Sequence, residues 1–106
     1  PVDVQATLTE LTASACAAST SSYEKNSKIL AVCGGGALNT HLMQRLQALL
    51  PGVSVVPTDD LGLPAMQVEA AAFAWLARQT LLGQTGNLQS VTGAKGARVL
   101  GAVYPA

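Results

Sequence analysis

Three consecutive glycines, Gly34–Gly36, form the stretch of this sequence that points most clearly to a ligand. They follow a short apolar run, Ile29–Cys33, which predicts a buried strand, and a leucine-bearing segment that begins near Asn39 predicts a helix just after them. Glycines allow a ligand to approach the backbone closely, and a helix N-terminus offers unpaired N–H groups and partial positive charge. We therefore expect phosphate at this turn, with a tight turn that binds nothing as the alternative.

Two common nucleotide-binding motifs can be compared with the glycine run. The P-loop is excluded, because its lysine is missing: none lies between Lys28 and Lys95. The dinucleotide fingerprint G-x-G-x-x-G is a near miss, since Gly34 and Gly36 match its first two positions but Asn39 occupies the third. A dinucleotide-binding, Rossmann-like domain of an oxidoreductase therefore stays open as an alternative.

Other residues of reactive type have a plain structural interpretation. His41 has no serine or cysteine in a nucleophile motif and is expected to be solvated or to cap a helix. Asp59–Asp60 could bind ribose or a metal, but adjacent aspartates before Leu-Gly more often shape a turn. Phe73 and Trp75 are expected to pack in a core or an interface, and Ser90–Gly93 to be a connector.

The composition excludes several classes of protein. Six basic residues balance six acidic ones with no basic run, which argues against nucleic-acid binding. No apolar stretch approaches the roughly 20 residues of a membrane span, and the first ten residues do not resemble a signal peptide. Cys16 and Cys33 are too few for a disulfide framework and are expected to be free, buried thiols in a reducing compartment. Charged residues make up only 11% of the chain, so we expect further protein to cover part of its surface.

Helical and strand-like segments alternate along the chain, which predicts an α/β fold: a small parallel sheet flanked by helices, as part of a larger doubly wound domain. The predicted elements are a helix from Asp3 to about Ser19, a strand at Ile29–Cys33, a helix from about Asn39 to Leu50, a strand at Val53–Pro57, a helix from about Ala65 to Leu82 and a short strand within Val99–Tyr104. Polar loops are expected at Ser19–Lys28, Thr58–Pro64 and Gln84–Gly96.

Apolar spacing also predicts which helix faces are buried. In the first helix, which Asp3 is expected to cap, the predicted buried residues are Val4, Leu8, Leu11, Ala15 and Ala18. In the second helix they are Leu42, Leu46, Leu49 and Leu50.

The strand, the glycines and the helix opened by Asn39 together resemble the adenosine motif of the sugar kinase, Hsp70 and actin superfamily. Four segments more narrowly resemble the C-terminal part of anhydro-N-acetylmuramic acid kinase, in that family's order. They are DVQATLTELTA (3–13), VCGGGALNTHLMQRLQALLPG (32–52), TDDLGLPAMQVEAAAFAWLARQTL (58–81) and NLQSVTGA (87–94).

This resemblance implies a fold and a reaction. Residues 1–106 would be a single domain, the C-terminal part of the second lobe of an actin-like, ribonuclease H-like ATPase. The family uses ATP and Mg²⁺ to open the anhydro bridge of its sugar with water and to phosphorylate the 6-position, in cytoplasmic cell-wall recycling. The resemblance implies that Gly34, Gly35, Gly36 and Asn39 border the nucleotide.

The resemblance also implies what the chain lacks. The family's phosphate loop, catalytic aspartate and most Mg²⁺ ligands belong to an N-terminal lobe that is not recognisable here, so no residue is assigned as catalytic or metal-binding and the chain alone is expected to be inactive. Glu69 is the only ionisable residue between Asp60 and Arg78, and two interpretations of it stay open. It faces solvent or pairs with a group of the missing lobe, or, as the resemblance implies, it contacts the sugar. An exposed sheet edge is expected to cause self-association. A non-catalytic interaction module is the remaining alternative.

Overall fold

The structure is a computed structural model that describes residues 2–20 and 27–105. The chain divides into two compact units, residues 1–68 and residues 69–106. The prediction of a single domain within a larger lobe stays a prediction. Most of the predicted loop Ser19–Lys28 lies outside the described residues.

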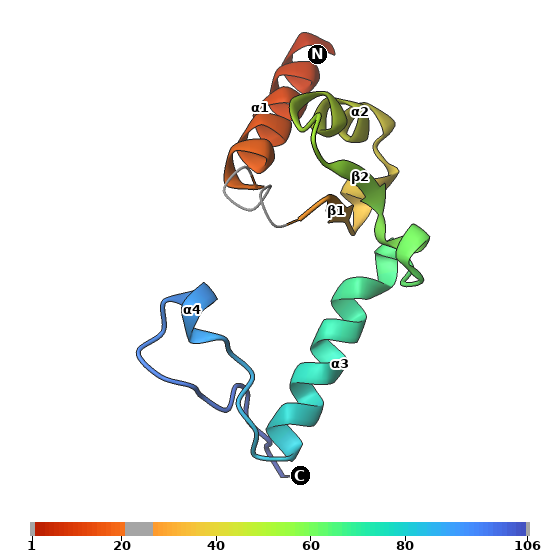
Figure 1. The fold of residues 1–106 in the computed structure, drawn as a ribbon. Coiled ribbons are helices and arrows are strands. Elements are labelled where there is room, and N and C mark those ends of the chain that lie inside the picture. The colour runs from red at the N-terminus through yellow and green to blue at the C-terminus, as the bar shows by residue number, and fades with distance from the viewer. Residues whose placement is uncertain (1, 21–26, 106) are drawn as a thin grey trace. The chain divides into compact units, whose positions relative to one another are not determined.

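The first unit contains a two-stranded parallel sheet with two helices beside it (Figure 1). Its elements are α1 (Val2–Thr20), β1 (Ile29–Val32), the 3-10 helix η2 (Gly35–Leu38), α2 (Thr40–Leu49), β2 (Ser54–Pro57) and the 3-10 helices η3 (Thr58–Leu61) and η4 (Ala65–Gln67). Ile29 lies opposite Ser54, and Val32 lies opposite Pro57. The prediction of two neighbouring parallel strands connected through a helix is therefore confirmed.

The core of this unit lies between the sheet and its helices. It is formed by Ala17 of α1 with Leu50 and Val53, and Leu30 and Val55 of the two strands pack against it. Leu50 is the most completely enclosed large side chain, with 1% of its surface exposed. The core therefore packs against one face of the sheet through Leu30 and Val55.

The predicted buried face of α1 is wrong. Ala13 and Ala17 are buried, whereas Val4, Leu8 and Leu11 are more than half exposed, and Ala15 and Ala18 are exposed as well. The physical reason is that α1 meets its neighbours through small residues, which allow helices to approach closely. Asp3 lies within the first turn of α1 and not at its N-cap, because the helix already includes Val2.

Three further burial predictions are wrong. Exposed and half-buried residues alternate along β1, because only one of its faces packs on the core described above. Leu49 lies off the buried face of α2, with 36% of its surface exposed. Cys16 and Cys33 are free, as predicted, but both are exposed.

The second unit consists of one long helix and an irregular tail. α3 (Val68–Leu81) follows η4, so the first turn of the predicted third helix is a 3-10 helix, and Gly83 ends the segment with a φ of 64°. Phe73 and Trp75 are at least half exposed, so they form no core, and their role in an interface stays a prediction. No helix among residues 2–20 and 27–105 is long and apolar enough to cross a membrane.

The tail is held by the side chain of Asn87 and by a backbone hydrogen bond from the Gly86 N–H to the Arg98 carbonyl (2.9 Å). The Asn87 side chain donates to the Gly96 carbonyl (3.0 Å) and accepts from the Arg98 N–H (2.7 Å). The predicted strand Val99–Tyr104 is wrong, because the segment has no strand partner among residues 2–20 and 27–105 and Gly101 turns it with a φ of 89°. Part of the predicted connector Ser90–Gly93 belongs to a short helix, α4 (Gln89–Thr92).

Candidate functional site

The glycine turn joins the carboxyl end of β1 to the start of η2. Gly34 has a φ of 70° and a ψ of −167°, a conformation adopted almost only by glycine. Its N–H donates to the Ala65 carbonyl (2.9 Å), and its carbonyl accepts from the Ala37 N–H (3.1 Å). The backbone therefore requires glycine at position 34 and holds the turn in one defined conformation.

The space beside the turn is open at two of the three glycines. A Cβ atom added to Gly34 or Gly35 would meet no heavy atom within 4 Å, whereas one on Gly36 would lie 3.4 Å from Cδ2 of Leu42. Gly36 thus lies against α2, and Gly34 and Gly35 leave room for a ligand to reach the main chain. Of the residues described, these two glycines form the open part of the turn.

Asn39 begins α2, as the sequence predicted. It has extended backbone angles, and its Oδ1 accepts from the Leu42 N–H at 3.1 Å, which makes it the N-cap of the helix. This cap fixes the positive end of the α2 dipole close in sequence to the glycines. The arrangement of strand, open glycine turn and capped helix can bind phosphate through main-chain N–H groups.

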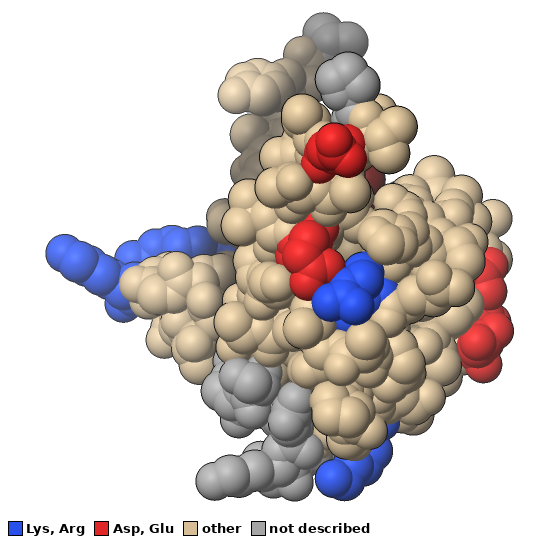
Figure 2. Space-filling model, turned by 90° about the horizontal axis from the view of Figure 1, so that it is seen from above, with Lys and Arg blue, Asp and Glu red and all other residues tan. Residues whose placement is uncertain are grey.

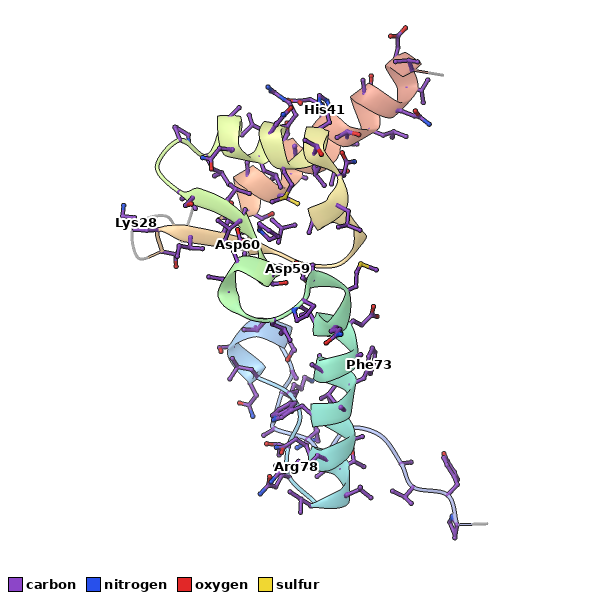
Figure 3. The ribbon with its side chains drawn as sticks, turned by 90° about the vertical axis from the view of Figure 1, so that its right-hand side faces the viewer. Lys28, His41, Asp59, Asp60, Phe73 and Arg78 are labelled. Carbon is purple, nitrogen blue, oxygen red and sulfur yellow. The ribbon has the colours of Figure 1, made fainter. Side chains whose placement is uncertain are left out.

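The carboxyl end of β2 lies at the same end of the sheet as the glycine turn, because the two strands are parallel. Figure 3 labels Asp59 and Asp60 in the turn that follows β2. Asp59 Oδ2 accepts a hydrogen bond from the Ala65 N–H at 3.0 Å and so shapes the loop, as the sequence predicted for these adjacent aspartates. Asp60 is exposed. The Thr58 hydroxyl oxygen is buried and has no hydrogen-bond partner among the described residues.

Sequence reasoning treated Thr58 only as the start of a loop. A hydroxyl residue directly after a predicted parallel strand was the signal that could have drawn attention to it, since ligands of such sheets bind beyond the carboxyl strand ends.

Glu69 lies in the second unit, in the first turn of α3, and its side chain is exposed. An exposed carboxylate needs no protein partner, so its position agrees with solvent contact and leaves its predicted sugar contact as a proposal.

Charged side chains on α1 and α2 form a structural contact. Arg45 donates to both carboxylate oxygens of Glu10, with Nε–Oε2 at 2.6 Å and Nη2–Oε1 at 2.9 Å. This hydrogen bond is the main cause that lowers the pKa of Glu10, and it also raises the pKa of Arg45. His41, labelled on α2 in Figure 3, lines an open groove of about 570 Å³ together with this pair. The pair joins the two helices, and Thr7 and Ser14 are the hydroxyl residues among the lining of this groove.

Charged groups are otherwise sparse. Figure 2 shows one face of the molecule on which Lys, Arg, Asp and Glu are few among the other residues. In the part of the chain that the structure describes, no group of three or more His, Cys, Asp or Glu residues could hold a metal ion.

Comparison with known proteins places the chain in a family. The family model for anhydro-N-acetylmuramic acid kinase matches residues 1–106. Curated proteins of that name from Variovorax paradoxus and Albidiferax ferrireducens are 67% and 66% identical over 106 residues, which is 100% of this chain and 28% and 27% of theirs. One from Cupriavidus pinatubonensis is 58% identical over 105 residues, 99% of this chain and 28% of its own. The chain thus spans about 28% of the length of the first of these relatives, and it belongs to the anhydro-N-acetylmuramic acid kinase family.

Proposed function

We propose that this chain supplies part of the ATP-binding site of a kinase that phosphorylates anhydro-N-acetylmuramic acid. The observation that carries the proposal is the open turn at Gly34 and Gly35, followed by a helix that Asn39 caps. The names of the relatives supply the substrate and the class of reaction. The resemblance to the superfamily implies that the nucleotide is ATP and that the turn belongs to an actin-like lobe.

Within this proposal, each residue of the turn has a distinct task. Gly34 and Gly35 leave room for the nucleotide beside the main chain, and Gly36 allows the turn to lie close to Leu42. Asn39 fixes the first turn of α2, whose N–H groups and dipole favour negative charge. ATP supplies the phosphoryl group that is transferred, and this chain binds and orients it.

The proposal leaves the chemical step to residues outside these 106. The phosphate loop, the catalytic aspartate that activates water and most Mg²⁺ ligands belong to the other lobe in the resembling family. We therefore expect no kinase activity from the chain alone, and activity from it would contradict this assignment. Its placement at the C-terminal end of the enzyme and a cytoplasmic location stay predictions.

The family membership favours the sugar kinase over the two alternatives from the sequence. A dinucleotide-binding domain would prefer NAD over adenine nucleotides, and an interaction module would bind neither. A nucleotide titration of the full-length enzyme distinguishes the three.

The decisive variant is Gly35→Val in the full-length enzyme. A valine here meets no atom of the described chain within 4 Å of its Cβ and needs no positive φ, so its expected effect is on a ligand and not on folding. We expect the Michaelis constant for ATP to rise at least about tenfold, equivalent to about 1.4 kcal/mol of binding. The Michaelis constant for the sugar should change much less.

Gly52→Val is the matched control. Gly52 is equally open and also lacks a positive φ, but it precedes β2 and so lies at the amino end of that strand. This control should keep a normal Michaelis constant for ATP. An unchanged value in Gly35→Val as well would remove the glycine turn from the nucleotide site.

Glu69 is proposed to accept hydrogen bonds from the sugar's hydroxyl or amide groups. Its carboxylate is exposed and lies in an alanine-rich helix, so it is available to a ligand. In Glu69→Gln, loss of one charge-assisted hydrogen bond should weaken sugar binding by roughly 1.5–3 kcal/mol, or about one to two powers of ten.

Asp3→Asn is the control for this variant. Asp3 is also an exposed acid in the first turn of a helix, so both substitutions remove the same favourable charge from a helix start. Kinetics should be measured with ATP and sugar varied separately. Wild-type sugar kinetics in a folded Glu69→Gln enzyme would make Glu69 a structural or solvent-facing residue.

A further inference from the structure

Two polar side chains hold the main chain around β2, one near each end of the strand. The Ser54 N–H donates to the Lys28 carbonyl at 2.8 Å, so the main-chain groups of the neighbouring Val53 and Val55 face away from β1. Gln47 on α2 closes that outer edge, because its Nε2 donates to the Val53 carbonyl at 2.9 Å and its Oε1 accepts from the Val55 N–H at 3.0 Å. Gln47 therefore fixes the amino end of β2 to α2.

Asp59 holds the loop that follows the carboxyl end of β2. Its Oδ2 accepts from the Ala65 N–H at 3.0 Å, and its carbonyl accepts from the Gly62 N–H at 3.1 Å. Gly62 has a φ of 89°, a backbone conformation that glycine adopts easily and that turns the chain back toward the aspartate. Asp59 thus closes the loop between β2 and η4 through both its side chain and its main chain.

Ala65 connects this loop to the glycine turn. It is buried, with 3% of its surface exposed, and its carbonyl accepts from the Gly34 N–H at 2.9 Å. The residue that Asp59 holds by its N–H thus holds Gly34 by its carbonyl. A displaced Ala65 would release Gly34, whose φ of 70° and ψ of −167° belong to a sparsely populated region of backbone conformation. The Asp59 carboxylate therefore acts on the conformation of the glycine turn through Ala65.

We propose that Asp59 is a positioning residue for ATP: it holds Ala65, and Ala65 holds the glycine turn in the conformation that accepts the nucleotide. The inference rests on the proposed ATP site and goes beyond it, since it makes a side chain of another loop responsible for the order of the turn. A turn that is ordered before ATP arrives avoids the loss of conformational freedom that binding would otherwise cause. Removal of the Asp59 carboxylate should therefore weaken the binding of ATP and spare that of the sugar.

Substitutions in the full-length enzyme test this role, with ATP and sugar varied separately. In Asp59→Ala we expect the Michaelis constant for ATP to rise about three- to tenfold, because the turn must then be ordered during binding. The value of kcat and the Michaelis constant for the sugar should change much less. Asp59→Asn keeps an oxygen that can accept from the Ala65 N–H, so it should restore most of the affinity for ATP.

Gln47→Ala is the matched control. It also removes hydrogen bonds from a side chain to the main chain, but at the other end of β2. This variant should be less stable in urea and keep a normal Michaelis constant for ATP. The comparison separates a general loss of stability from a loss of order at the glycine turn.

Amide hydrogen exchange in the wild-type enzyme tests the same role without any variant. A saturating non-hydrolysable ATP analogue should slow the exchange of the Gly34 and Ala65 amides at least about fivefold, because it stabilises the ordered turn and the loop that holds it. The Val55 amide, which Gln47 holds, is the internal control and should change much less.

The outcomes distinguish the positioning role from the ATP site itself. If Gly35→Val raises the Michaelis constant for ATP and Asp59→Ala does not, the site stands and the role of Asp59 is refuted. Equal rises in Asp59→Ala and Gln47→Ala, or an Ala65 amide that does not respond to the analogue, would also overturn the proposal. If Gly35→Val has no effect either, the proposed site fails and the role of Asp59 fails with it.

Discussion

Replacing Gly34 by alanine should destabilise the enzyme through the backbone alone. The added methyl group would meet no atom within 4 Å, so no clash opposes it. The φ of 70° and ψ of −167° remain, and forcing a residue with a Cβ into such a region costs about 1–3 kcal/mol. The hydrogen bond from the Gly34 N–H to the Ala65 carbonyl holds the turn in place and limits relaxation.

Gly35→Ala isolates this effect, because Gly35 is equally open but has no positive φ. Both substitutions reduce the conformational freedom of the unfolded chain to the same extent. This effect alone stabilises a protein by about 0.4–1 kcal/mol. That contribution cancels in the difference, so Gly34→Ala should be less stable than Gly35→Ala by about 1–3 kcal/mol.

Urea denaturation of the two full-length variants, followed by a probe in this part of the enzyme, measures the difference. Equal midpoints with equal slopes would show that the turn does not hold the strained conformation described here, and the reasoning from backbone angles would fail.

Three further predictions follow from the packing and the sheet edge. Glu10→Gln should lower the stability of the enzyme at neutral pH but not in strong acid, because the hydrogen bond from Arg45 lowers the pKa of Glu10 in the folded protein. The stabilisation by the Glu10 carboxylate is complete above the ordinary pKa of 4.5, and it disappears as the pH falls through the lowered pKa of the folded state. A pH series of thermal midpoints checks this, and an equal loss at all pH values would contradict it. Leu50→Ala should destabilise by about 2–5 kcal/mol in urea denaturation, since Leu50 is 1% exposed; exposed Leu61→Ala is the control, and similar losses in both would count against the described core. The isolated 106-residue chain should associate as its concentration rises, and sedimentation that shows only monomer at high concentration would refute this.

Local signals made the neighbourhood of the glycine turn predictable. The apolar run stops at glycines, which marks the end of a strand. Asn39 precedes regularly spaced leucines, which marks the start of a helix. The structure accordingly has β1, the N-cap and α2 within a residue or two of the predicted bounds. The loop-shaping role of Asp59 was also predictable, since turn-forming aspartates act on nearby backbone.

Features set by distant partners were not predictable. Leu8 and Leu11 satisfy a helical periodicity, but burial depends on which face meets another element, and here Ala13 and Ala17 do. Val99–Tyr104 has strand-forming residues but no strand to pair with in the described chain, so its propensity is not realised. The buried Thr58 hydroxyl likewise depends on how η3 packs against both strands.

The closure of one sheet edge by Gln47 limits how isolated chains could assemble. Growth of a fibril by strand addition needs a molecule that can pair on both sides, in the way that a linear polymer needs bifunctional monomers. Among the residues that the structure describes, the outer edge of β2 is closed and that of β1 has no strand partner. Each copy can accept one neighbour through its sheet, and a pair joined along both β1 edges has no open edge left. Edge-to-edge association of this fragment should therefore stop at the dimer, and Gln47→Ala is the substitution that would remove the terminating group.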